Sequence, residues 1–252
     1  MNLELAGKIA LVAGASRGIG LAIARALHAE GCSVAFAART RAGLEGATAD
    51  LHDRFSLHVA DVTDAGSAAA LVGEVSSRWG GPHVAICNAG SGASVPPGTE
   101  TPQEWQRVLN VNLFAATNII AAVRAPMRAA GGGAIVCVSS ICGLAALGAP
   151  VTYSAAKAAL NATVRGLARP LAAENIRLNA VAPGNILASG GTWERKLLEN
   201  ESAVHEMLTR DVAQARLGTP QEIADLVVFL SSARASFITG SICVADGGQL
   251  RA

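Results

Sequence analysis

A tyrosine and a lysine stand four residues apart in an apolar stretch, at Tyr153 and Lys157. In a helix this i, i+4 spacing places both side chains on one face. A tyrosine with its ordinary pKa of about 10 is a poor base at neutral pH, and lowering that pKa by roughly three units requires about 4 kcal/mol of differential stabilisation. A neighbouring ammonium and a cationic ligand would supply it. The pair therefore indicates acid/base chemistry, although such pairs also arise by chance on solvated helices.

Polar residues close two of the apolar runs that surround this pair. Ser139 and Ser140 follow one run, and Asn88, within Cys87–Gly90, follows another. Ligands of open α/β sheets bind beyond the carboxyl ends of the strands, which is where these residues fall. Asn110 and Asn112 lie in an apolar helical segment, where a buried amide needs partners. Each asparagine is equally well explained as a cap or a satisfied core amide, and residue chemistry does not choose between the serines.

A glycine-rich turn, Gly14-Ala15-Ser16-Arg17-Gly18-Ile19-Gly20, separates the first apolar run from an apolar helix. Glycine permits positive φ and close approach of the backbone to a ligand. The helix N-terminus offers free N–H groups and a positive dipole to a pyrophosphate. The turn therefore predicts a dinucleotide site, although its G-x-x-x-G-x-G spacing differs from the commoner G-x-G-x-x-G.

The same turn also satisfies G-x-S-x-G, the nucleophile elbow of α/β-hydrolases, with Ser16 as the nucleophile. A hydrolase needs an acid and then a histidine further along the chain, and the only late histidine is His205. An elbow on the first strand also has no preceding loop to complete an oxyanion hole. The hydrolase stays as the weaker alternative.

The end of the second apolar run bears on the choice of coenzyme. An acidic residue there would bind a ribose 2′-hydroxyl and repel a 2′-phosphate. This run ends Ala37-Ala38-Arg39 and has no acid, whereas Arg39 and Arg17 can pair with a phosphate. NADP(H) is the expected cofactor, against the alternative that both arginines are solvated surface residues.

Short apolar runs alternate with helical patterns along the whole chain, which is typical of strands buried by helices on both sides. The expected fold class is α/β, one doubly wound domain whose seven-stranded parallel sheet is flanked by helices on both faces. Strands are expected at Lys8–Ala13, Ser33–Ala37, Ser56–Ala60, Val84–Cys87, Ala134–Val138, Ile176–Ala182 and Ile242–Ala245. Helices are expected near 19–30, 41–50, 64–78, 102–130, 153–173 and 220–231, with Thr63 or Asp64, Thr101-Pro102 and Thr219-Pro220 at their starts.

One long excursion, residues 185–216, interrupts this alternation within the single domain 1–252. Excursions of this length in a compact domain are usually functional. This one has Gly190-Gly191 and then apolar residues near helical spacing, from Trp193 to Leu208. It is predicted to be a substrate lid, with an ordinary surface helical hairpin as the alternative.

Composition excludes several classes of partner. Charged residues are 15 % and the net charge is +1, so no broad field attracts nucleic acid or an anionic bilayer. The apolar runs are far shorter than the roughly 18–20 residues of a membrane span. No secretory signal is visible, so the cytoplasm is expected, with the five cysteines as mostly buried free thiols. The five histidines have no ligand spacing, so no metal is expected.

Taken together, the motifs resemble the short-chain dehydrogenase/reductase family, in its roughly 250-residue form with a Rossmann-type fold. The resemblance covers the whole chain and is carried by residues 14–20, Asp61-Val62, Asn88-Ala89-Gly90, Asn112, Ser140, Tyr153, Lys157, Pro183-Gly184 and Asp246-Gly247-Gly248. Ordered motifs at family spacings are specific, whereas any one of them alone would not be.

The resemblance implies a role for each residue. Tyr153 would be the acid/base, Lys157 would lower its pKa and hold the nicotinamide ribose, Ser140 would orient the substrate carbonyl, and Asn112 would fix a relay water. Cofactor contacts would come from Gly14, Ser16, Arg17, Gly18, Ile19, Gly20, Arg39, Asp61, Val62, Asn88, Ala89, Gly90, Tyr153, Lys157, Pro183, Gly184 and Ile186. The implied reaction is direct hydride transfer between NADP(H) and a small-molecule ketone or secondary alcohol.

Two positions depart from the family pattern. Ala13 replaces the usual threonine that opens the glycine turn, and Ala188 replaces a threonine that would bond the nicotinamide carboxamide, with Ser189 as a possible substitute. The chain looks most like 3-oxoacyl-carrier-protein reductases and related ketone reductases. NAD-linked sugar, polyol or steroid dehydrogenases of the same family are the alternative, and a non-catalytic nicotinamide-binding regulator is a remote one. A homotetramer is expected through the helices near 102–130 and 153–173.

Overall fold

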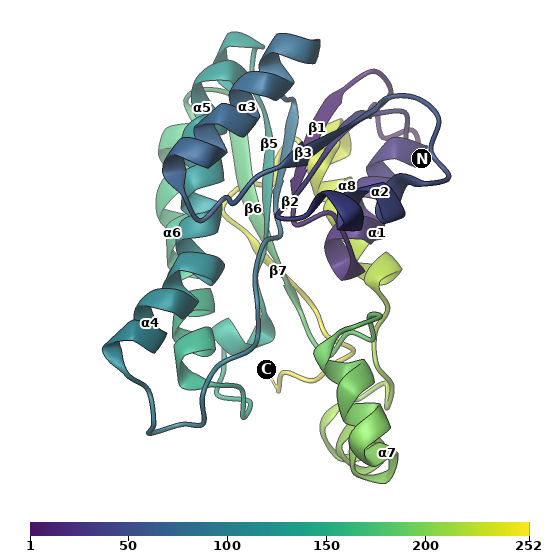
Figure 1. The fold of residues 1–252 in the computed structure, drawn as a ribbon, viewed down its shortest axis with the longest axis vertical. Helices are drawn as coiled ribbons and strands as arrows, with labels where there is room; N and C mark the ends of the chain where they lie inside the picture. The colour runs from purple at the N-terminus through teal and green to yellow at the C-terminus, as the bar shows by residue number, and fades with distance from the viewer. Residues whose placement is uncertain (252) are drawn as a thin grey trace.

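The seven apolar runs form one parallel sheet, as the sequence predicts. The computed structural model describes residues 1–251. The strands are β1 (Ile9–Ala13), β2 (Ser33–Ala38), β3 (Phe55–Val59), β4 (Val84–Cys87), β5 (Gly133–Val138), β6 (Ile176–Pro183) and β7 (Ile242–Ala245), in the order β3-β2-β1-β4-β5-β6-β7 (Figure 1). The order reverses between β1 and β4, and this is the point where open α/β sheets bind ligands.

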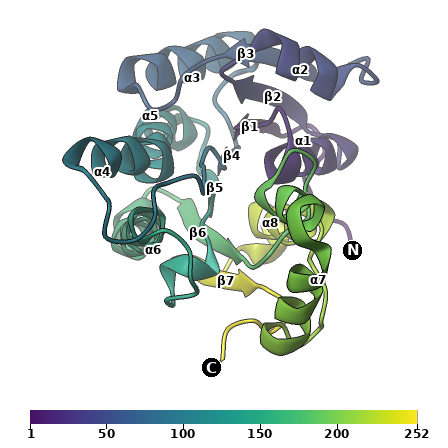
Figure 2. The ribbon, with the colours of Figure 1, turned by 60° about the horizontal axis from the view of Figure 1, so that its bottom comes forward.

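Successive residues of each strand face opposite layers of helices, because side chains alternate across a sheet. In β1, Leu11 packs into one apolar cluster and Val12 into the other, and both are fully buried. One layer holds α3 (Ala65–Trp79), α5 (Ala115–Ala129) and α6 (Val151–Ala172); the other holds α1 (Gly18–Ala29), α2 (Arg41–Thr48) and α8 (Pro220–Ser231) (Figures 1 and 2). Burial on both faces explains why the central strands β1, β4 and β5 are continuously apolar, whereas the edge strand β3 alternates apolar and polar residues.

The expected start signals cap three helices. Asp64, rather than Thr63, caps α3 by accepting a hydrogen bond from the backbone N–H of Ser67. Thr101 caps α4 (Pro102–Leu109), and Thr219 forms a reciprocal capping box with Glu222 at α8. Side-chain oxygens at these positions satisfy N–H groups that the first turn leaves free.

The helix expected at 102–130 is interrupted. A turn of π-helix, Asn110–Phe114, separates α4 from α5. Such turns are rare and occur frequently at functional sites. By length and composition alone the whole segment Pro102–Ala129 would pass as a membrane span. The buried residues of α5, among them Ile119 and Val123, pack in the cluster between the sheet and α3.

The excursion after β6 contains a helix, α7 (Thr192–Asp211), with a non-helical residue at Asn200. It projects beyond the carboxyl ends of the strands (Figure 1). Its apolar residues form a small cluster of their own, namely Val204, Leu208 and Val212 with Trp193, Leu197, Met207 and Leu217. The segment therefore has little contact with the main core, which is consistent with a part of the fold that can move.

The five cysteines are free thiols, as expected. Cys32, Cys87 and Cys137 are buried, and Cys142 and Cys243 are partly exposed. Burial raises the pKa of the Cys32 thiol to about 12, which makes that thiol unreactive.

Candidate active site

Tyr153 and Lys157 lie on one face of α6, near its N-terminal end. The Lys157 Nζ atom is 5.9 Å from the centre of the Tyr153 ring and donates a hydrogen bond to the carbonyl oxygen of Val138 at 2.8 Å. Lys157 is only 4 % exposed, and this burial lowers its pKa from 10.5 to about 8. The lysine thus holds its charge at neutral pH in a buried position directly beyond β5.

The two serines that follow β5 have different partners. The hydroxyl of Ser139 donates to Asn161 Oδ1 at 2.6 Å inside the layer of α6. Ser140 caps a 3-10 turn, Ile141–Gly143, by accepting from the backbone N–H of Cys142 at 3.1 Å. The Ser140 Oγ therefore accepts from Cys142, and its own proton is available to the phenol of Tyr153.

Burial and Ser140 act in opposite directions on Tyr153. Burial raises the pKa of Tyr153 above its ordinary value, and a hydrogen bond from Ser140 lowers it, with burial the larger cause. The phenol is therefore protonated at neutral pH in the chain alone. A protonated tyrosine beside a serine proton is suited to donating to a carbonyl oxygen.

The π-helical turn aims Asn112 at the loop after β4. Asn112 is 2 % exposed; its Oδ1 accepts from the N–H of Ser91, and its Nδ2 donates to the carbonyl oxygen of Ser91, both at 3.0 Å. A Cβ placed on Gly90 would lie 3.1 Å from Asn112 Oδ1 and 3.4 Å from Lys157 Nζ. Asn112, Gly90 and Lys157 therefore meet at one point, whereas Asn110 bonds Gln106 at the surface.

The glycine turn after β1 is tight and lies against Asn88. Gly14 and Gly18 have φ of +79° and +58°. Asn88 Nδ2 donates to the carbonyl oxygen of Gly14 at 3.0 Å, which joins the ends of β1 and β4. Helix α1 begins at Gly18 without a side-chain cap, so its first N–H groups are free to bind an anion. The turn fits a dinucleotide phosphate.

Gly20→Ala should disrupt this turn. A Cβ on Gly20 would lie 2.1 Å from the carbonyl oxygen of Gly14 and 2.3 Å from Asn88 Nδ2. We expect destabilisation by about 1–3 kcal/mol, as for other overpacked sites, and at least a tenfold weaker binding of NADPH in fluorescence titration. Gly73→Ala is the control: nothing lies within 4 Å of a Cβ there, and thermal unfolding should show about 0.5–1 kcal/mol of added stability. Equal effects of the two substitutions would contradict this account of the turn.

Arg39 and Asp61 follow neighbouring strands, β2 and β3. Asp61 accepts from the N–H and the hydroxyl of Thr63, and these bonds, together with the charge of Arg39, lower the pKa of its carboxyl group. Arg39 is exposed beside this carboxylate. Val62 is 6 % exposed, and its carbonyl oxygen accepts from Asn118 at 3.1 Å. The edge of the sheet next to the glycine turn thus presents one cation and one fixed carboxylate.

The start of the excursion lies over the glycine turn. Arg17 Nη1 donates to the carbonyl oxygen of Gly190 at 3.0 Å. A Cβ on Gly18 would lie 3.6 Å from the Cβ of Ala188. Ile186, after Pro183 and Gly184, forms an isolated parallel bridge with Gly218. Ala188 therefore lies next to the glycine turn.

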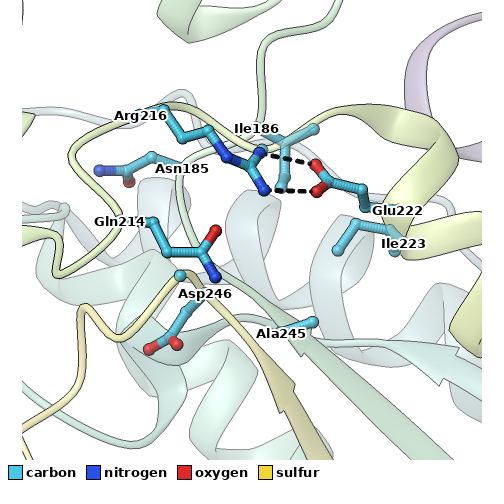
Figure 3. Close-up of a pocket in the computed structure, with 10 residues that line it drawn as sticks. Asn185, Ile186, Gln214, Arg216, Glu222, Ile223, Ala245 and Asp246 are labelled. Carbon is cyan, nitrogen blue, oxygen red and sulfur yellow. Dashed lines mark hydrogen bonds and ion pairs between the residues drawn. The ribbon is translucent and has the colours of Figure 1, made fainter.

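A cavity of about 160 Å³ lies beside the excursion, between the loop after β6, the start of α8 and the end of β7. Figure 3 shows the Arg216–Glu222 ion pair on its wall and Asp246 at its lower side. Asp246 accepts from the backbone N–H groups of Gly248 and Leu250, so its carboxylate is already satisfied. The residues around this cavity do not include Tyr153.

The hydrolase alternative lacks its histidine. His205 is exposed on α7 beside Glu201 and forms no hydrogen bond to Ser16 within residues 1–251. A Ser–His–carboxylate chain does occur elsewhere: His58 bonds Ser56 and Glu74 at 2.8 Å each. There the serine is buried and the carboxylate is exposed, the reverse of what a nucleophile needs. Among residues 1–251 no group of three potential metal ligands is found.

Two features of the site are missing from the sequence interpretation. Asn112 contacts Ser91, and Thr152 is fully buried next to Tyr153 and bonds Ser94. The contact of Thr152 with Ser94 has one local signal in the sequence, the favourable i, i+3 spacing of Glu104 and Arg107, to which Ser94 is bonded. Ser94 and Thr152 themselves come from segments far apart in the chain and give no sequence pattern.

Comparison with known proteins gives a consistent result over the whole chain. Residues 14–249 match the family described as enoyl-(acyl carrier protein) reductase. The chain is 34 % identical over 253 residues to the 3-oxoacyl-[acyl-carrier-protein] reductase of Chlamydia muridarum, covering 99 % of this chain and 100 % of that protein.

Solved structures agree with this match. The L-sorbose reductase of Gluconobacter frateurii, complexed with NADPH and L-sorbose, superposes with a TM-score of 0.94 at 31 % identity over 100 % of both chains. A 7α-hydroxysteroid dehydrogenase complexed with NADH and 7-oxo glycochenodeoxycholic acid gives a TM-score of 0.91 at 28 % identity, covering 100 % of this chain and 97 % of that one. The two neighbours differ in coenzyme and in substrate.

Proposed function

The chain belongs to the short-chain dehydrogenase/reductase family of nicotinamide-dependent oxidoreductases, and from that membership we propose that it is an NADP(H)-dependent enzyme that interconverts a ketone and a secondary alcohol, with Tyr153 as the acid/base. One observation supports this most: Tyr153, Ser140, Lys157 and the Asn112–Gly90 contact converge beyond the carboxyl ends of β4 and β5. These groups hold and donate protons, as carbonyl reduction requires.

A nicotinamide bound across the β1–β4 crevice would supply the hydride. The residues proposed to hold it are Gly14, Ser16, Arg17, Gly18, Ile19, Gly20, Arg39, Asp61, Val62, Asn88, Ala89, Gly90, Tyr153, Lys157, Pro183, Gly184 and Ile186. The N–H groups at the start of α1 receive the phosphates, and the glycine turn leaves room for them. The backbone of Ile186, rather than a side chain at Ala188, faces the carboxamide in this proposal.

The proton chemistry follows from the contacts in the site. Ser140 donates to the carbonyl oxygen of the substrate, because its own oxygen is already bonded by Cys142. Tyr153 donates the proton to that oxygen as charge develops on it. Lys157 supplies a buried positive charge beside the phenol, and its bond to Val138 fixes its position. Asn112 fixes the loop at Ser91, and we propose that it also orients a water for proton return.

Preference for NADP(H) rests on Arg39 and on the lack of an acid at the end of β2. A guanidinium pairs with a phosphate through charge-assisted hydrogen bonds. Arg17 lies on the same side of the site, at the start of α1, and its Nη1 bonds the excursion. The solved neighbours hold NADPH in one case and NADH in another. Arg39 is therefore proposed to decide the coenzyme in this chain.

Arg39→Asp should reverse the coenzyme preference towards NADH. The substitution removes a charged hydrogen bond, which contributes about 1.5–3 kcal/mol, and its new carboxylate repels a 2′-phosphate. We therefore expect the KM for NADPH to rise about tenfold to hundredfold. Arg41→Asp is the matched control, because it makes the same change of charge two residues later, at an exposed pair with Glu45. Kinetics with both coenzymes would measure the effect, and unchanged selectivity would remove Arg39 from the proposal.

The substrate is proposed to be a small ketone or its alcohol, as in 3-oxoacyl reductases. NAD-linked sugar, polyol or steroid oxidation is the second candidate. The steroid complex with NADH among the neighbours favours it, whereas the sorbose complex holds NADPH and supports only the sugar as a substrate class. The segment 141–152, which runs from the end of β5 into the first turn of α6, has no charged residue, and its Leu144 and Val151 are exposed. These features favour an uncharged substrate. Oxidation of NADPH with a panel of ketones, β-keto thioesters and sugars, followed by absorbance, tests the proposal; no turnover with any of them would contradict it.

A homotetramer in the cytoplasm is proposed as the working form. Helices α4, α5 and α6 lie side by side on one flank (Figure 2), where Phe114 is 40 % exposed. Small residues on α6, such as Ala155 and Ala158, permit close approach of a second copy. Sedimentation equilibrium would test the assembly state.

A further inference from the structure

Four side chains link α4 to the residue before Tyr153. Ser94 Oγ lies 2.7 Å from Glu104 Oε1 and 2.6 Å from Thr152 Oγ1. Arg107 binds the Glu104 carboxylate through two nitrogens, at 2.6 and 2.7 Å. We call Thr152, Ser94, Glu104 and Arg107 the clamp. It joins three separate segments: α4, the loop after β4 and the first turn of α6.

The direction of each hydrogen bond in the clamp follows from counting protons. Glu104 is ionised, because bonds from Arg107, then from Ser94, lower its pKa to about 2. An ionised carboxylate only accepts hydrogen bonds, so Ser94 donates its single hydroxyl proton to Glu104. The hydroxyl of Thr152 must then donate to Ser94. The bonds therefore run in one sense, from Thr152 through Ser94 to the carboxylate, and no hydroxyl is free to reorient.

The clamp is sheltered where it meets α6 and also fixes the loop. Thr152 is 0 % exposed, and the Glu104 side chain is 13 % exposed. Arg107 Nη2 also donates to the carbonyl oxygen of Ala93 at 2.9 Å. Asn112 holds the same loop two residues earlier, at Ser91. The loop is thus tied to α4 and the π-helical turn on one side and to the start of α6 on the other.

We propose that Glu104 is a positioning residue for the reaction, acting through Ser94 and Thr152 to hold Tyr153 and the loop after β4 at a fixed separation. Neither Glu104 nor Ser94 touches the reacting atoms in this proposal. A displacement of about 1 Å in a reacting group can cost a hundredfold in rate. The first turn of α6 has no side-chain cap at Pro150. Besides Tyr153 itself, which bonds Ser140, Thr152 is the side chain of that turn with a hydrogen bond to another segment.

The inference rests on the proposed role of Tyr153, and a second readout keeps it testable by itself. Tyr153 is the only tyrosine in the chain, so phenolate absorbance reports its ionisation alone. Burial holds the pKa of Tyr153 above its ordinary value. If the clamp loosens, the partly exposed Tyr153 gains further contact with water, and that pKa falls towards about 10.

The experiment compares Glu104→Gln and Thr152→Val with two controls. Thr152→Ser keeps the hydroxyl. Glu174→Gln removes the Glu174–Arg124 ion pair, which matches the Glu104–Arg107 pair in exposure. The glutamate side chains are 16 % and 13 % exposed, and both arginine side chains are 49 % exposed. We expect Glu104→Gln and Thr152→Val to lower kcat about tenfold to hundredfold with unchanged NADPH affinity, and to lower the Tyr153 pKa. Thr152→Ser and Glu174→Gln should match the parent chain in both readouts.

Each outcome decides one question. A Thr152→Val chain with parental kcat and a parental phenol titration overturns the clamp. Equal losses in Glu174→Gln also overturn it, because they would show a general effect of ion pairs. If the parent chain reduces no ketone, the proposed function fails, while the phenol titrations still decide the inference. Should Glu104→Gln not fold by circular dichroism, Thr152→Val and Thr152→Ser carry the comparison.

Discussion

Tyr153→Phe should abolish NADPH oxidation with any ketone that the parent chain reduces, while NADPH still binds. Positioned proton donors contribute typically a hundredfold to ten-thousandfold, and the chain has no other tyrosine to replace this one. Burial keeps the phenol protonated at neutral pH, so in the reducing direction the donor is ready before the substrate arrives. The substitution removes one oxygen and keeps the ring, which leaves the packing beside Lys157 nearly unchanged.

Two measurements separate this expectation from a general loss of structure. Quenching of tryptophan fluorescence should give the same dissociation constant for NADPH as in the parent chain, and circular dichroism should give the same melting temperature within a few degrees. Turnover within tenfold of the parent value would show that another group supplies the proton. Ser140 would then be the next candidate, since its hydroxyl bonds the Tyr153 phenol in the parent chain.

The arrangement of the sheet could be predicted from the sequence, because burial on both faces requires apolar residues at successive positions of the central strands. The strands β1, β4 and β5 are apolar without alternation, and each expected strand is found within about one residue of its predicted ends. The start of α8 was equally readable, since Thr219 and Pro220 form a local capping signal. These features depend on neighbours in the chain, so their pattern is visible without the fold.

The partners of the site residues could not be predicted, because they are set by contacts between distant segments. Asn112 and Ser91 are 21 residues apart, and Ser94 and Thr152 are 58 apart. The π-helical turn at Asn110–Phe114 has the composition of an ordinary helix. It becomes distinct only because Asn112 bonds both Ser91 and Val108. Residue chemistry alone likewise does not separate Ser139 from Ser140, because the bond from Ser139 to Asn161 joins residues 22 apart.

Lys157→Met should remove turnover and also remove a pH dependence of stability. Burial lowers the pKa of Lys157 to about 8 from 10.5. Between these two pH values the unfolded chain binds more protons than the folded chain, so stability rises with pH across this window. The full rise is roughly 3 kcal/mol at 1.36 kcal/mol per pKa unit. Below pH 8 both states hold the proton, and this contribution to the slope vanishes.

Urea unfolding at several pH values between 7 and 10 would measure this slope, with Lys8→Met as the control because Lys8 is exposed before β1. The parent and Lys8→Met chains should gain stability with pH, and Lys157→Met should lack that gain. Activity should move the opposite way: kcat/KM of the parent chain should fall above pH about 8, as Lys157 loses the charge that assists Tyr153. A flat rate profile through pH 9 would contradict that role. The opposite signs follow from one cause, since the charge that is costly to bury is the charge that the proton transfer uses.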